Sequence, residues 1–229
     1  MRRALARIPI PIPYMAEGTR EGDKPLLGAL MVAHAAVFMA MPPALKSALA
    51  LWPSAAKGYA PVTALCVQYT GFHLAMTLWP FWLFGGIVSG AVGFWFFPLY
   101  LACGVAGALA HLAAAASAGV AVPAVGAQGA VAGLVVAAVV LDPRARLQCF
   151  STVPTGRYTS ASVSFSLSAL LFAVLYTPVL VLFASGGGAA AWSVLGGGAF
   201  GLVAALVLKF TASGAPAAVH TLSGGAGLN

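Results

Sequence analysis

Residues 123–133 read PAVGAQGAVAG and residues 191–201 read AWSVLGGGAFG. Both stretches repeat glycine or alanine at four-residue spacing. Small residues four positions apart share one face of a helix, so two helix backbones can approach closely inside a membrane. Because many unrelated bundles share this pattern, it predicts helix packing rather than a fold. The glycines expected at such a contact are Gly126, Gly129, Gly133, Gly197 and Gly201.

The composition around these stretches is that of a membrane protein. Of the 229 residues, 61% are hydrophobic and 7% are charged, and the mean hydropathy is +0.97. A soluble domain carries about a quarter charged residues, so a water-soluble globule is excluded. The formal charge of +7 rests on too few residues to form a nucleic-acid surface. Three cysteines provide neither a disulfide framework nor a zinc cluster.

Six apolar segments approach the length of about 20 residues that a helix needs to cross a bilayer. We therefore expect an all-α integral membrane protein with a six-helix bundle. The expected spans are residues 26–41, 62–84, 94–117, 122–141, 163–183 and 190–210.

The remaining segments are short and contain no second domain. Residues 1–25 form a basic, proline-rich arm before the membrane domain at 26–210, and a Gly/Ala-rich tail follows at 211–229. Within the domain, residues 43–61 mix Leu and Trp with Lys, which is typical of a segment lying along the interface. Residues 142–161 are expected to be a loop.

Positive charges are distributed unequally between the two sides that six spans would create. Nine Lys and Arg residues fall on the side of both termini, whereas only Lys46 and Lys57 fall on the other. The positive-inside rule then places both termini on the cytoplasmic, matrix or stromal side. The first fifteen residues contain three Arg and no acid, so they are either a mitochondrial targeting signal or a short arm with membrane-side charge.

Ionisable groups that could perform chemistry are nearly absent from the expected spans. None has Asp, Glu, Lys or Arg at its centre, which removes the usual parts of an ion-coupled transporter. His34, His73 and His111 lie in or near spans and His220 lies in the tail. A b-type haem is a remote alternative, because no two histidines have a recognisable spacing on one helix face.

Taken in order, several stretches resemble the rhomboid intramembrane serine protease family. FHLAMT at 72–77, with the aromatic run that ends in Gly85–Gly86, is similar to the second core helix of the family. Residues 94–112 are similar to the third helix, and 123–133 to the fourth-helix pattern P-x-V-G-A-S-G-A-x-x-G. Residues 143–146 resemble the exit loop, and 191–201 resemble the sixth helix. The resemblance extends over residues 26–210 and implies a six-helix rhomboid-like bundle.

The departures from the family pattern fall on its catalytic positions. The serine nucleophile is replaced by Gln128, whose amide is a poor nucleophile, and the histidine base is replaced by Val194. His73 matches a helix-two residue that stabilises the oxyanion, whereas Thr77 replaces the usual asparagine. An oxyanion hole has no reaction to accelerate without a nucleophile. We therefore expect a pseudoprotease with no catalytic residue, cofactor or metal.

The resemblance and the few exposed charges favour a structural role among lipids and other membrane proteins. The first expectation is an accessory subunit of a larger membrane complex, such as a mitochondrial ATP synthase, respiratory or translocase assembly. The alternative is a stand-alone pseudoprotease that binds transmembrane clients at its small-residue grooves and at the aromatic edges 79–82 and 94–97. Those aromatic residues are equally typical of an interfacial belt. Gln128 is expected to hydrogen-bond between helices.

Overall fold

The structure of the protein, a computed structural model, describes residues 12–17, 24–119, 121–154, 160–184 and 190–213. The α-helices are α1 (Lys24–Ala40), α2 (Pro43–Leu49), α3 (Ala60–Cys66), α4 (Gly71–Val92), α5 (Phe96–Ala118), α6 (Gln128–Leu141), α7 (Ala169–Ala184) and α8 (Ala190–Ser213). Two 3-10 turns are η3 (Pro53–Ala55) and η4 (Gly93–Trp95). The strands are β1 (Ile12–Ala16), β2 (Arg146–Pro154) and β3 (Ser160–Ser168).

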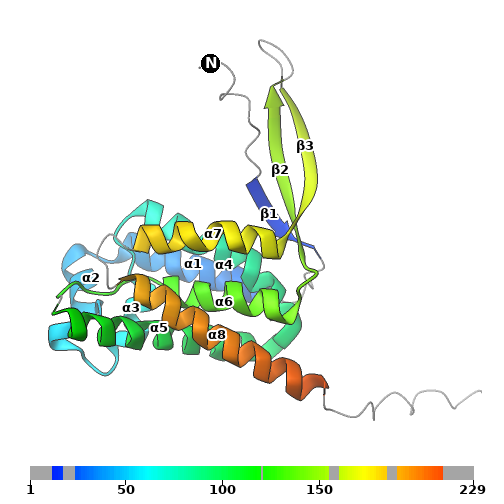
Figure 1. Ribbon diagram of the computed structural model, residues 1–229. Helices are drawn as coiled ribbons and strands as arrows, with labels where there is room; N and C mark the ends of the chain where they lie inside the picture. The colour runs from blue at the N-terminus through cyan, green and yellow to red at the C-terminus, as the bar shows by residue number, and fades with distance from the viewer. Residues whose placement is uncertain (1–11, 18–23, 120, 155–159, 185–189, 214–229) are drawn as a thin grey trace, which may run out of the picture.

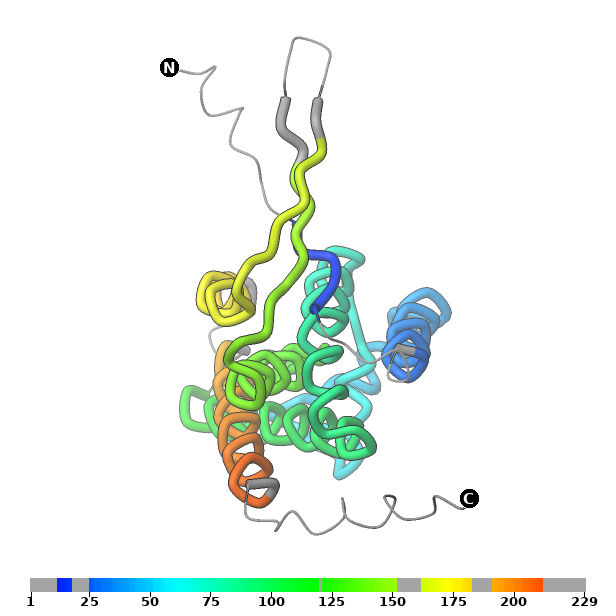
Figure 2. The backbone as a smooth tube through the Cα atoms, turned by 90° about the vertical axis from the view of Figure 1, so that its right-hand side faces the viewer, coloured from blue at the N-terminus to red at the C-terminus, as the bar shows by residue number. Residues whose placement is uncertain are grey.

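The long helices form a bundle with α6 at its centre (Figures 1 and 2). Helices α4, α5, α7 and α8 all contact α6, whereas α1 lies at the edge against α4 and α3. Nearly every residue of α6 from Gly129 to Ala138 is buried. This burial explains why α6 is apolar all round, as a helix enclosed by other helices must be.

Two continuous helical stretches are long and apolar enough to cross a membrane, Gly71–Ala118 and Ala191–Thr211. The first contains α4 and α5, separated at Gly93, whose φ of +54° favours glycine. The remaining apolar helices α1, α6 and α7 are 17, 14 and 16 residues long. The mostly helical character is therefore as expected, while three of the six expected spans correspond to shorter helices.

The helix boundaries differ from the expected spans at three places. The expected span 62–84 is divided, because α3 ends at Cys66 and α4 runs from Gly71 to Val92. Helix α6 begins only at Gln128, since residues 121–127 are extended or turned. Helix α7 begins at Ala169, because residues 163–168 belong to β3. Hydropathy alone does not separate an apolar strand or loop from the apolar helix that follows it.

A three-stranded antiparallel sheet replaces the expected loop at 142–161 and makes the fold more than all-α. The order is β1-β2-β3, with Leu147 paired to Leu167 and Phe150 paired to Ser164. Strand β1 comes from the arm that precedes α1 and pairs Ile12 with Phe150. The sheet stands at one end of the bundle, nearly perpendicular to the helices (Figure 1).

Two tryptophans of α4 attach the sheet to the bundle. Trp79 Nε1 donates a hydrogen bond to the Pro13 carbonyl (2.8 Å), and Trp82 Nε1 donates one to the Tyr14 carbonyl (3.1 Å). These carbonyls lie on β1, an edge strand, where proline is tolerated because that edge needs no ladder donor. These two hydrogen bonds hold the sheet beside α4.

Helix α8 lies in close contact with both α5 and α6. The backbone of Gly197 meets the backbone of Gly129, and Gly201 meets Gly133, so closely that a Cβ would clash. On its other side, Gly196 meets Ala106 and Ala110 of α5. Such backbone contact requires glycine on both helices, as the four-residue spacing predicts.

Candidate functional site

The start of α6 is held in place by backbone hydrogen bonds from the segment before α4. Leu51 and Ala124 exchange two hydrogen bonds, of 3.0 and 2.9 Å, and the Gly126 N–H donates to the Ala64 carbonyl (2.8 Å). Gly126 has φ +86°, a conformation that other residues rarely adopt. These bonds set where α6 begins and therefore where Gln128 lies.

The structure brings the two catalytic positions of the family pattern onto facing segments. Gly129, which follows Gln128, lies against Ser193, which precedes Val194. A Cβ on Gly129 would be 2.9 Å from Ser193 Oγ. Gln128 is half-buried at the first residue of α6. Chain segments 65 residues apart thus meet where the family places its nucleophile and base.

Val194 lies in a cluster of aliphatic side chains and one tyrosine. Its side chain is 2% exposed and packs with Ala132, Tyr176 and Leu180. Three further apolar side chains, Met76, Phe172 and Val181, cover this cluster. Val194 is thus a well-packed aliphatic side chain.

Of the two positions that match the second core helix of the family, His73 contributes a polar side chain to the site and Thr77 does not. The Thr77 hydroxyl donates to the His73 carbonyl one turn earlier (2.9 Å), so it is engaged by its own helix. His73 lies in the first turn of α4, where its N–H donates to the hydroxyl of the N-cap residue Thr70 (3.1 Å). Thr77 therefore does not supply the donor that the asparagine of the family pattern would supply.

Gln68, which sequence reasoning did not single out, is the second polar group at this place. Its side chain is fully buried, and neither amide atom has a hydrogen-bond partner among the described atoms; the same holds for His73 Nε2. A Cβ on Gly126 would be 2.6 Å from His73 Nε2 and 3.1 Å from Gln68 Oε1. The only signal in the sequence is a glutamine within an apolar stretch.

This cluster has polar groups that can bind a ligand. An amide and an imidazole can donate to a carbonyl or a water oxygen. Burying an amide without a hydrogen-bond partner costs about 1–3 kcal/mol of folding free energy. The Gln68 amide therefore lowers the stability of the fold unless a ligand or a water binds it. Covalent hydrolysis also needs a nucleophile and a base, which Gln128 and Val194 do not provide.

A hydrogen bond closes the seam between α4 and α7 next to this cluster. Pro80 lies inside α4 and has no N–H, so the Met76 carbonyl one turn earlier lacks its helical donor. The Tyr176 hydroxyl of α7 donates to that carbonyl at 2.7 Å. The hydrogen bond that Pro80 removes from α4 is thus replaced by one from a side chain of α7.

Aromatic rings of α4 and α7 also contact one another beside this hydrogen bond. Trp79 meets Phe172 edge-on at 5.6 Å, and Phe84 contacts Phe172 at 6.0 Å between ring centroids. Phe172 stacks on Tyr176 at 5.8 Å. A helix entering between α4 and α7 would have to separate these rings and the Tyr176–Met76 bond.

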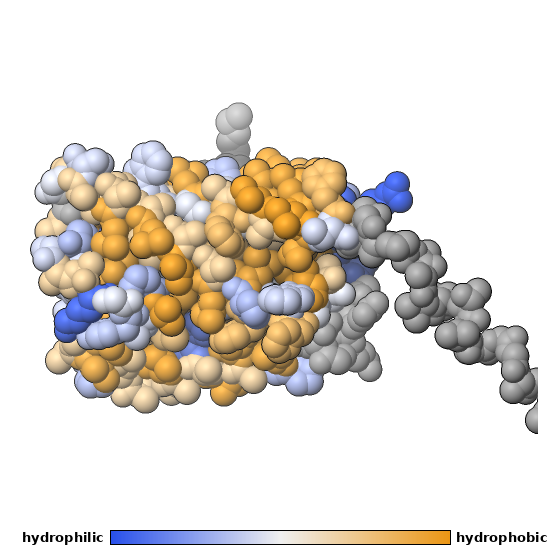
Figure 3. All heavy atoms as spheres, turned by 90° about the horizontal axis from the view of Figure 1, so that it is seen from below, coloured by the Kyte–Doolittle hydropathy of each residue, from blue (hydrophilic) through white to orange (hydrophobic). Residues whose placement is uncertain are grey.

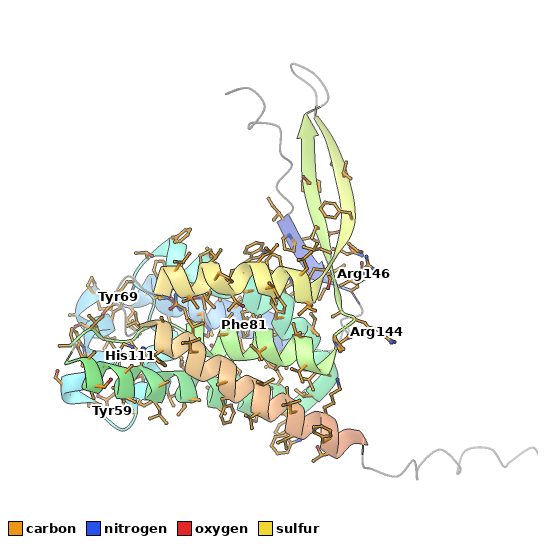
Figure 4. All side chains as sticks on the ribbon, in the orientation of Figure 1. Tyr59, Tyr69, Phe81, His111, Arg144 and Arg146 are labelled. Atoms are coloured by element: carbon orange, nitrogen blue, oxygen red, sulfur yellow. The ribbon has the colours of Figure 1, made fainter. Side chains whose placement is uncertain are left out.

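The other histidines are used within the bundle. His34 Nδ1 lies 2.9 Å from the Leu30 carbonyl, so this nitrogen carries the proton and Nε2 accepts from the Tyr100 hydroxyl at 3.0 Å. His111 Nε2 donates to the Val122 carbonyl (3.0 Å). Both rings are buried, and Figure 4 shows His111 at the end opposite Arg144. His220 lies outside the described residues.

Comparison with known proteins agrees with this arrangement. No curated protein matches the chain. The family model described as Rhomboid domain matches residues 56–210, more than half of the chain and all of the site. Together with the order of the helices, this match shows that the chain belongs to the rhomboid family of membrane proteins.

Proposed function

We propose that the chain is a catalytically inactive rhomboid-family protein that serves as a fixed accessory subunit of a larger membrane complex. The observation that carries the proposal is the packing of Val194 among Ala132, Tyr176 and Leu180, where hydrolysis would need a base. With Gln128 in place of a nucleophile, the site retains groups that bind and none that attack.

The closed seam supports a fixed role over the transient binding of clients. A protein that captures transmembrane helices needs an accessible groove, whereas α4 and α7 are joined by the Tyr176–Met76 hydrogen bond and by contacts of Trp79 with Phe172 and Tyr176. Strand β1, bonded to Trp79 and Trp82, adds a further layer beside α4. Opening all of these contacts for each client would be energetically costly.

The outer surface supports contact with lipid and with other membrane helices. The face on the side of α5 and α8 is dominated by hydrophobic residues (Figure 3). Helix α8 exposes eight large apolar side chains along its length: Trp192, Leu195, Phe200, Leu202, Val203, Leu206, Val207 and Phe210. These residues can pack against a neighbouring subunit without a soluble domain.

Six passes are proposed for α1, α4, α5, α6, α7 and α8, with both termini on the positive side. The charge count of nine to two supports this orientation. The mitochondrial inner membrane is the proposed location, on the basis of the three arginines in residues 1–7, which lie outside the described residues.

A native gel of digitonin-solubilised membranes, with quantitative mass spectrometry of the band, tests the proposed role. A fixed subunit comigrates with one set of partners at constant stoichiometry and remains bound in a harsher detergent such as dodecyl maltoside. A band at monomer or dimer size would contradict this role and favour the stand-alone, client-binding pseudoprotease.

A further inference from the structure

A groove lies where the ends of α4, α6 and α8 meet. Its volume is about 530 Å³, and its walls include Val92, Trp95, Leu141, Leu208, Lys209 and Thr211. These residues come from three helix ends and from η4, so the groove belongs to no single element. Its lining combines the apolar side chains of Val92, Leu141 and Leu208 with a polar rim of Lys209 and Thr211. This combination suits an amphipathic molecule.

Lys209 gives this groove its charge. The side chain is exposed, and its Nζ donates to the Val140 carbonyl at 2.9 Å. Val140 is the residue before the end of α6, where carbonyls lack helical donors, so Lys209 caps α6 from another helix. That bond holds the exposed ammonium at the rim of the groove.

Aromatic residues mark the groove as a membrane–water boundary. Trp95 in the wall is 62% exposed, and Phe210, next to Lys209, is 73% exposed. Tryptophan is enriched at the depth of lipid headgroups, and lysine at a helix end extends toward them. Below this rim, Val92, Leu141 and Leu208 offer only apolar surface.

The charge of this end of the bundle favours an anion. Arg144 and Arg146 are exposed and lie at the same end, as Figure 4 shows. The carboxylate of Asp142 accepts from the Arg144 N–H, and that of Glu17 contacts the Ser166 hydroxyl. Lys209, Arg144 and Arg146 outnumber these two described acids. Basic grooves between membrane helices on the positive side bind anionic headgroups.

We propose that this groove is a binding site for an anionic phospholipid. The phosphate would lie against Lys209 and the Thr211 hydroxyl beside the Trp95 ring, with one acyl chain along Val92, Leu141 and Leu208. A zwitterionic lipid would gain the same apolar contact without the net attraction. The inference is independent of the proposed subunit role.

Native mass spectrometry of the purified full chain, titrated with phosphatidylglycerol or phosphatidylcholine, tests the site. We expect tighter binding of phosphatidylglycerol, and Lys209→Gln should weaken that binding about fivefold while leaving phosphatidylcholine unchanged. Lys209→Arg should keep the preference because it keeps the charge. Lys57→Gln removes one cation at the opposite end and should change nothing.

A second variant keeps the test decisive if Lys209→Gln folds poorly. Ala91→Phe leaves the charge in place but fills the groove that Ala91 lines, so both lipids should bind less. Equal binding of the two lipids by the unaltered chain would overturn the proposal. So would a loss in Lys57→Gln as large as that in Lys209→Gln, or full phosphatidylglycerol binding in Ala91→Phe.

Discussion

The surroundings of Val194 decide what a single substitution at this site can achieve. A histidine placed there would enter a cluster of Ala132, Tyr176 and Leu180, in which the Tyr176 hydroxyl already donates to the Met76 carbonyl. The Thr77 hydroxyl is already bonded to the His73 carbonyl. A single substitution at Val194 would therefore leave these surrounding contacts in place.

The double variant Gln128→Ser/Val194→His should not cleave a fluorogenic transmembrane substrate in liposomes. Its histidine would be surrounded by Ala132, Tyr176 and Leu180, and the second oxyanion donor is missing. An active rhomboid protease on the same substrate is the positive control. Cleavage above the level of Gln128→Ala would show that the remaining geometry is still competent.

Tyr176→Phe should destabilise the chain by about 1–3 kcal/mol, because the Met76 carbonyl beside Pro80 loses its only donor in the seam. Thermal unfolding can be followed with a thiol-reactive dye, since Cys103 and Cys149 are buried until the chain opens. Tyr59→Phe, at a half-exposed tyrosine, is the matched control. Equal melting of both variants would disprove the role of this bond.

The residues of the site were only partly predictable from the sequence. Gln128, Val194, His73 and Thr77 followed from their place in the family pattern. Gln68 did not, because it comes from the segment before α4, and its approach to His73 depends on Gly126 and on tertiary backbone bonds. Burial of a single amide cannot be predicted from an apolar stretch alone.

At the scale of elements, the contact between α6 and α8 depends on glycines that face each other. Gly197→Ala should destabilise the chain by about 1–3 kcal/mol or more, because its Cβ would meet the Gly129 backbone, which cannot move aside. Gly198→Ala, one position along the same helix, meets only Val136 at 3.7 Å and should be neutral or stabilising. Similar unfolding temperatures for both would contradict the helix contact described here.

The sheet makes a prediction through Cys149, which is fully buried in β2. Burial raises the pKa of this thiol, so less thiolate is present near neutral pH than in an open chain. In a Cys66→Ala/Cys103→Ala background, alkylation should be slow at pH 7.5 and accelerate at higher pH than for a free cysteine. A rate profile with the ordinary midpoint near pH 8.5 would indicate that the sheet is absent.

Polar and apolar residues alternate along β3 in the sequence, but residues 163–168 were nevertheless expected to belong to a helical span. Serine occupies every second position of Ser160–Ser168, which is typical of a strand. The long apolar run that follows merged with it into one expected span. The pairing of β1 with β2, more than 130 residues away, depends on contacts that no local pattern contains.

At the scale of the whole molecule, the helical bundle was predictable and its additions were not. Hydropathy located each apolar helix because every long helix must bury or expose apolar surface to lipid. The sheet at the Arg144 end, the break before α4 and the late start of α6 depend on loop geometry. The sheet stands at one end of the bundle (Figure 1), and the other two departures lie beside the site.

The central claim is that this rhomboid-family chain does not hydrolyse peptide bonds. The most direct measurement treats the purified chain in liposomes with a serine-directed fluorophosphonate probe and maps adducts by mass spectrometry, beside an active rhomboid protease. We predict no adduct on the chain and full labelling of the control. A stoichiometric adduct on one serine, for example Ser193, with substrate cleavage lost in Ser193→Ala, would contradict the account.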